Sequence, residues 1–101
     1  MKTHKTAVIF RKYKDGEILA LFPEYPGTNN PATCLSYAHV GQHGSADPCP
    51  RGTKPARPAE FRALARELRR LGYRLRIVKR NTRTHYRARV AEIHRTGHAT
   101  D

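Results

Sequence analysis

The chain has 101 residues, with 20 Lys and Arg against 8 Asp and Glu and a formal net charge of +12. At roughly 100 to 200 residues per domain, this length provides for one domain with one small core and excludes a multidomain enzyme. No segment approaches the ~20 apolar residues of a membrane-spanning helix, and the apolar run at residues 7–10 is too short for a signal-peptide core, so we expect a cytoplasmic protein that does not enter a membrane.

Residues 7 to 23 have the pattern of a β-hairpin, because two apolar runs flank Asp15 and Gly16. A two-residue type I′ turn at this position pairs Phe10 with Leu21 and Ile9 with Phe22. Alternation along the strands then predicts two faces. One face carries Val8, Phe10, Leu19 and Leu21, and the other carries Ile9, Arg11, Tyr13, Ile18, Ala20 and Phe22.

The next part of the chain is rich in prolines and glycines. Residues 23 to 33 are predicted to form a loop. A third strand is expected from Cys34 to Gln42, where Leu35, Tyr37 and Val40 alternate weakly. Residues 44 to 57 show no periodic pattern and are expected to form a long second loop.

A helix is predicted from Pro58 to Leu71, since proline suits the first helical turn and Gly72 suits the stop. Its apolar stripe is Phe61, Leu64, Ala65, Leu68 and Leu71, and its opposite face carries Arg62, Arg66, Arg69 and Arg70. Residues 73 to 80 alternate as a strand does. This strand directs Tyr73, Leu75 and Ile77 toward the helix and Arg74, Arg76 and Arg80 outward.

The last segment, residues 81–101, is expected to be a tail. Tyr86, Val90 and Ile93 recur at helical spacing, so a short helix beginning near Thr84 and ending at Gly97 either docks on the body or frays. The predicted fold is therefore a single α+β domain over residues 1–80. Its order is β-β-β-α-β, with one sheet, one principal helix on one sheet face and this short C-terminal helix as an optional addition.

Positive charge is concentrated in residues 51–80, which hold eleven basic and two acidic residues, a net +9. Such a patch attracts nucleic acid through counterion release, and arginine suits phosphate contact. The predicted contacts are Arg62, Arg66, Arg69, Arg70, Arg74, Arg76, Arg80, Arg11 and Tyr13. The sheet face opposite the principal helix would combine Arg11, Tyr13, Phe22, Arg74 and Arg76 into a stacking surface for single-stranded RNA or DNA, unless the tail helix covers it.

Four residues could ligate zinc in principle: Cys34, His39, His43 and Cys49. Their spacing fits no common zinc finger, and Cys34 and His39 diverge on a regular strand, so we expect no metal. A separate hypothesis takes Tyr37, His39 and His43, which share one strand face, as the functional segment of a small histidine-dependent RNase. A glycine-rich loop that would hold a nucleotide phosphate is missing from the sequence, so nucleotide hydrolysis is not expected. We also expect no cofactor.

Several segments carry a resemblance: Thr6–Arg11, the Asp15-Gly16 turn, Ile18–Glu24, Ser36–Gly44 and Thr53–Ala56. Through them the chain resembles a family of small uncharacterised proteins encoded on bacteriophages, plasmids and integrative mobile elements. The resemblance covers residue 6 to about residue 80. It implies a bacterial cytoplasm and a role in the life of a mobile element, and it assigns no catalytic or binding residue.

The leading hypothesis is a non-enzymatic accessory protein of a mobile element that binds RNA or DNA through the arginine-rich helix and strand. The alternative is an inhibitor or adaptor that binds an acidic protein partner or a host defence complex. The third is the histidine-dependent RNase.

Overall fold

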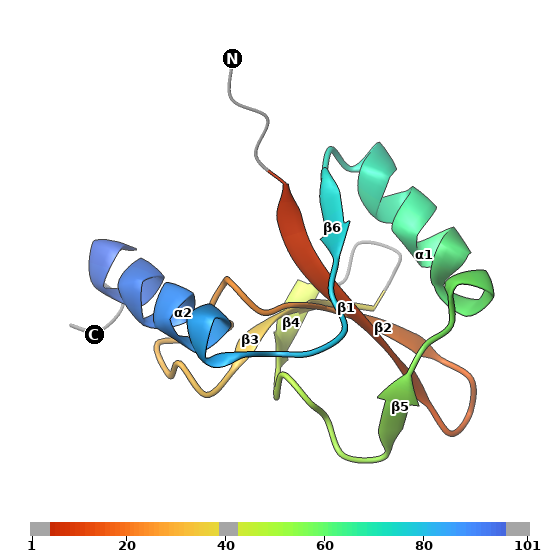
Figure 1. Cartoon of the computed structure of the whole chain (residues 1–101), viewed down its shortest axis with the longest axis horizontal. Coiled ribbons are helices and arrows are strands. Elements are labelled where there is room, and N and C mark those ends of the chain that lie inside the picture. Colours follow the sequence, from red (N-terminus) through yellow and green to blue (C-terminus); the bar gives the residue numbers. More distant parts are fainter. Residues whose placement is uncertain (1–4, 39–42, 97–101) are drawn as a thin grey trace.

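The structure is a computed structural model that describes residues 5–38 and 43–96 (Figure 1). Within these residues the chain forms six strands and two helices, and the predicted α+β class is confirmed. The elements are β1 (Thr6–Tyr13), β2 (Ile18–Phe22), β3 (Cys34–Tyr37), β4 (His43–Ala46), β5 (Thr53–Pro55), α1 (Pro58–Arg70), β6 (Leu75–Ile77) and α2 (Arg83–Thr96).

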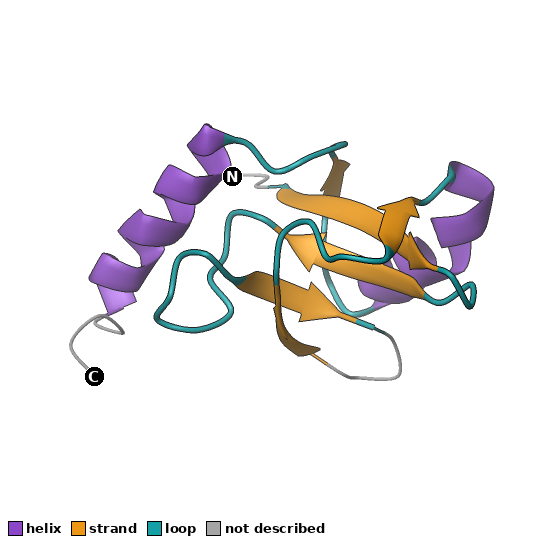
Figure 2. Ribbon diagram, turned by 90° about the horizontal axis from the view of Figure 1, so that it is seen from below, coloured by secondary structure: helices purple, strands orange, loops and turns teal. Residues whose placement is uncertain are grey.

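All strands belong to one sheet built around β1. On one edge β1 pairs with β2, and β3 and β4 follow outward, all antiparallel. The other edge is divided between two short strands. β5 pairs antiparallel with residues 11–13 of β1, and β6 pairs parallel with residues 6–8. The two helices lie at opposite ends of the sheet (Figure 2).

Both ends of α1 follow directly from the sequence. Pro58 occupies the first turn, and the backbone N–H of Arg57 donates to Glu60 Oε1 at 2.8 Å. At the other end Gly72 has φ of +108°, the Gly72 N–H donates to the Arg69 carbonyl, and the Tyr73 N–H donates to the Leu68 carbonyl. This is a Schellman ending, which a glycine permits without steric cost. The predicted start at Pro58 and stop signal at Gly72 are therefore confirmed, but the helix ends one residue before Leu71, which is 54% exposed and not part of the buried stripe.

The main core lies between α1 and one face of the sheet. Phe61 stacks on Phe10 of β1 with ring centroids 4.2 Å apart. The buried residues of this core are Val8, Phe10, Ala20, Phe22, Tyr37, Phe61, Leu64, Ala65 and Leu68. Ile9, Leu19, Leu21 and Cys34 form a smaller buried cluster on the opposite sheet face. Both faces of the central strands are thus covered.

The predicted hairpin is present, but its predicted register is wrong by one residue. Phe10 pairs with Ala20 and Ile9 with Leu21, because the loop has three residues. Gly16 adopts φ of +94°, and the Tyr13 N–H donates to the Glu17 carbonyl at 2.9 Å. A three-residue loop with glycine in the left-handed region is the common alternative to a type I′ turn.

The change in register alters which side chains share a face, as the period of two requires. Phe22 and Ala20 lie with Phe10 under α1, whereas Leu19 and Leu21 lie on the opposite face. The predicted stacking surface therefore does not form, since Phe22 is fully buried in the α1 core.

The predicted third strand is wrong in its extent. β3 ends at Tyr37, and the chain reverses so that His43 of β4 pairs antiparallel with Tyr37. Residues 39–42, including His39, lie outside the described residues. β4 was not predicted because His-Gly-Ser-Ala has no apolar alternation. The predicted long loop at 44–57 is correspondingly wrong, since it contains most of β4 and all of β5.

The C-terminal helix is present and docks on the loop between β2 and β3. The Thr82 N–H donates to His85 Nδ1 at 3.1 Å, and the His85 N–H donates to Thr82 Oγ1 at 3.3 Å, which caps α2 reciprocally. Burial lowers the pKa of His85. The predicted stripe is wrong at Tyr86, which is 43% exposed, while Arg89 is 2% exposed.

Candidate functional site

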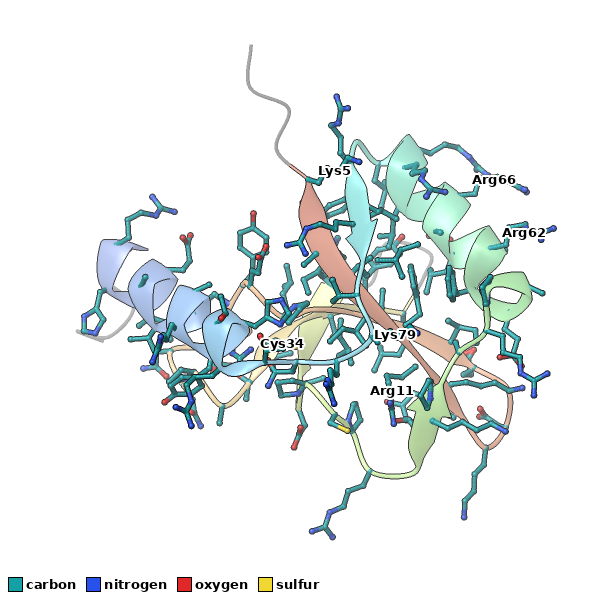
Figure 3. The ribbon with its side chains drawn as sticks, in the orientation of Figure 1. Lys5, Arg11, Cys34, Arg62, Arg66 and Lys79 are labelled. Atoms are coloured by element: carbon teal, nitrogen blue, oxygen red, sulfur yellow. The ribbon has the colours of Figure 1, made fainter. Side chains whose placement is uncertain are left out.

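Four arginines line the solvent side of α1. The side chains of Arg62, Arg66, Arg69 and Arg70 are all exposed. At 3.6 residues per turn they fall within an arc of about 100° on the side of the helix away from the core. Figure 3 shows Arg62 and Arg66 projecting away from the sheet. We call these four residues the α1 arginine face.

Among the described residues, no carboxylate forms an ion pair with the α1 arginine face. The two acidic residues of α1 have other partners. Glu60 pairs with Lys12 of β1, and Glu67 accepts a hydrogen bond from the Tyr37 hydroxyl. The positive charge of the four guanidinium groups is therefore not compensated by a described carboxylate, which leaves them accessible to an external anion.

The three arginines predicted on the last strand are also exposed, but they do not extend the α1 arginine face. Arg74 and Arg76 flank Leu75, which packs toward the α1 core, so by alternation both point to the other side of β6. Arg76 donates to Glu24 at 3.2 Å. Arg80 follows β6 in the connection to α2. The predicted cationic set is therefore divided between two sides of the sheet.

Arg11 has an internal role in the structure. Its Nε donates to Thr53 Oγ1 at 3.1 Å, and its terminal nitrogen donates to the Thr53 carbonyl at 2.9 Å. Figure 3 shows Arg11 beside β5. Arg11 thus holds β5 against β1. Tyr13, two residues further along, is 37% exposed.

Two residues of the predicted functional segment, Tyr37 and His43, meet across β3 and β4. Their ring centroids are 4.7 Å apart. His43 Nε2 also lies 3.1 Å from the hydroxyl of Tyr73, whose ring stacks on Phe22 at 5.1 Å. Burial raises the pKa of Tyr73, and the tautomer of His43 sets which of the two groups donates this hydrogen bond. Sequence reasoning missed Tyr73, because thirty residues separate it from His43.

We expect the His43 contact to stabilise the fold without contributing to nucleic-acid binding. His43→Ala should lower the free energy of unfolding by about 1 kcal/mol, the scale of one lost side-chain hydrogen bond. Tyr73→Phe removes the same bond from the other side, so the double variant should cost less than the sum of the two. Urea unfolding measures all three variants. If the loss of stability in the double variant equals the sum of the losses in the two single variants, the His43–Tyr73 bond does not stabilise the fold.

The candidate zinc ligands are not brought together where the structure describes them. Cys34 is buried and Cys49 is exposed, and within residues 5–38 and 43–96 no three His, Cys, Asp or Glu residues cluster as metal ligands do. Burial raises the pKa of the Cys34 thiol to about 11.

Elemental analysis should therefore find well under one zinc per chain in protein purified without a chelator or an affinity tag. Near-stoichiometric zinc that disappears in Cys49→Ser would contradict this expectation.

Comparisons with protein-family models, with curated proteins and with solved structures find no match to this chain. Neither of the two helices is long and apolar enough to cross a membrane, within the residues described.

Proposed function

We propose that the protein binds nucleic acid as a non-enzymatic accessory factor and that the α1 arginine face is its principal contact. The single observation behind this proposal is that four exposed guanidinium groups share one side of one helix, without a carboxylate partner among the described residues. Arginine forks match phosphate oxygens, and a rigid helix fixes their spacing. A mobile-element context, implied by the family resemblance, belongs to the same proposal.

Salt dependence tests this function directly. Binding of labelled RNA and DNA, followed by fluorescence anisotropy, should be micromolar or tighter at about 50 mM salt and should weaken steeply toward about 200 mM. The triple variant Arg62→Gln, Arg66→Gln and Arg70→Gln should bind on the order of 10- to 100-fold more weakly at low salt and show a shallower salt slope. Circular dichroism should confirm that α1 remains folded, since none of these side chains is in the core.

A matched control carries the same change of net charge elsewhere. Arg51, Arg83 and Arg87 are exposed and lie outside α1, so their triple glutamine variant also has a net charge of +9, from +12 less three. It should lose less than about threefold in affinity. Equal losses in the two triple variants would mean that bulk charge, not the helix face, drives binding. Absence of binding by the wild-type protein at about 50 mM salt would overturn the proposal.

The RNA in these assays should remain intact. If the wild-type protein cleaves the RNA and the folded His43→Ala variant does not, the histidine-dependent RNase hypothesis would take the place of the binding proposal. If the immobilised protein retains an acidic protein but no nucleic acid, the adaptor hypothesis is favoured instead.

A further inference from the structure

A hollow of about 450 Å³ lies where the end of β1 meets β5. It is lined by Lys12, Tyr13, Lys14, Gly52, Thr53 and Lys54. This volume falls in the usual range of about 300–1,000 Å³ for small-ligand sites. The lining includes three lysines and one tyrosine but no carboxylate. Its composition therefore suits a ligand that has both a negative charge and a flat ring.

The positive charge of this hollow is only partly compensated. Lys12 and Lys54 are directly opposite each other in the antiparallel register, an arrangement that repulsion disfavours. Glu60 of α1 pairs with Lys12. Neither Lys14 nor Lys54 has an ion-pair partner among the described residues. Two ammonium groups thus remain free for an external anion.

The walls of the hollow are held in place by contacts behind them. Thr53 Oγ1 donates to the Pro50 carbonyl at 2.6 Å, and Arg11 donates to both the side chain and the carbonyl of Thr53. The Tyr13 N–H donates to the Glu17 carbonyl at 2.9 Å, which fixes the backbone that carries the ring. The Tyr13 ring stacks on no other ring in the described part of the chain.

The hollow lies near the start of α1, the helix that carries the proposed nucleic-acid surface. A neighbouring hollow of about 390 Å³ shares Lys12 and Lys54 with the first and is completed by Pro55, Glu60 and Arg57, the residue that precedes α1. The α1 arginine face begins at Arg62, little more than one helical turn further on. Lys54 and Arg57 thus place positive charge between the start of the helix and the hollow, where Glu60 neutralises Lys12.

We infer that this hollow takes one nucleotide of a single-stranded nucleic acid, with its base stacked on Tyr13 and its phosphate between Lys14 and Lys54. The inference rests on the proposed function and deepens it, because it names single strands as the preferred ligand. A base inside a duplex is already stacked on its neighbours and cannot lie on Tyr13. RNA and DNA single strands share the required chemistry.

The experiment compares binding of a single-stranded oligonucleotide, as RNA and as DNA, with binding of the matching duplex. Tyr13→Leu should weaken single-strand binding about tenfold, the scale of one lost base stack, and change duplex binding less than twofold. Tyr86→Leu is the matched control, since Tyr86 on α2 is 43% exposed and lies outside the hollow. Lys14→Gln with Lys54→Gln should also lower single-strand affinity about tenfold. A single strand carrying 5-iodouracil should photocross-link to Tyr13.

Three outcomes would overturn the inference. Unchanged single-strand affinity in the Tyr13 and lysine variants, while the α1 triple variant loses binding, would remove this site and leave the proposed function intact. Equal losses for single strands and duplex in Tyr13→Leu would remove the preference for single strands. A wild-type protein that binds neither form would overturn both proposals.

Discussion

Replacing Arg89 with methionine should lower the free energy of unfolding by about 2–4 kcal/mol, because the side chain is buried and donates three hydrogen bonds. Arg89 Nε donates to the Pro31 carbonyl at 2.7 Å, and Nη1 donates to the Pro23 carbonyl at 2.7 Å and to Asn81 Oδ1 at 2.8 Å. Methionine keeps the length of the chain but leaves both carbonyls without this donor. α2 would then lose its main attachment to the loop between β2 and β3.

Urea unfolding checks this expectation, with Arg87→Met as the control on the same helix. Arg87 is exposed, so its replacement should change stability by less than about 0.5 kcal/mol. Arg89→Lys should fall between the two, since an ammonium group keeps the charge but loses the planar fork. Equal unfolding midpoints for Arg89→Met and the wild type would show that α2 is held by other contacts.

Arg89 also shows why the docking of α2 could not be predicted from the sequence. The pattern of Tyr86, Val90 and Ile93 predicted a helix, and the helix is present. The inward side, however, is built on His85, Arg89 and Ile93, all below 10% exposed. From the sequence alone, an arginine that donates hydrogen bonds to the carbonyl groups of a distant loop cannot be distinguished from an arginine exposed to solvent. Apolar periodicity alone therefore misplaced the buried face.

The sequence predicted those features of the fold that depend on residues close together in the chain. The ends of α1 depend on Pro58, its first residue, and on Gly72, two residues after its last, so the start was predicted at the correct residue and the end to within one residue. The hairpin was also found, because Asp15 and Gly16 interrupt two apolar runs. Its register depended on whether the loop has two or three residues, and both loops are compatible with Asp-Gly.

The candidate site divides in the same way. The α1 arginine face was predictable, because four arginines opposite an apolar stripe must face solvent once the helix packs. The internal role of Arg11 was not, since its partner Thr53 lies 42 residues away in a strand with no sequence pattern. Arg76 was likewise separated from Glu24 by 52 residues. Partners at such separations are set by the sheet topology, which the pattern did not specify.

Phe22→Ala should lower the free energy of unfolding by about 3–5 kcal/mol, the usual cost of truncating a buried phenylalanine. Phe22 is 0% exposed, belongs to the core under α1 and stacks on Tyr73. The register predicted from sequence would instead place Phe22 on the face opposite α1. Tyr13→Ala, at the end of the partner strand, is the control and should cost less than about 1 kcal/mol.

A small domain can lose its fold altogether at such a cost, so Phe22→Leu provides a milder test of the same contact. It should cost about 1–2 kcal/mol, because leucine fills most of the volume but cannot stack. The same change loosens the support under Tyr73, whose hydroxyl holds His43 at 3.1 Å. We therefore expect the cost of His43→Ala to shrink when it is measured in the Phe22→Leu background. A Phe22→Leu cost near zero, or an undiminished His43 cost, would show that the stack on Tyr73 does not support the β4 contact.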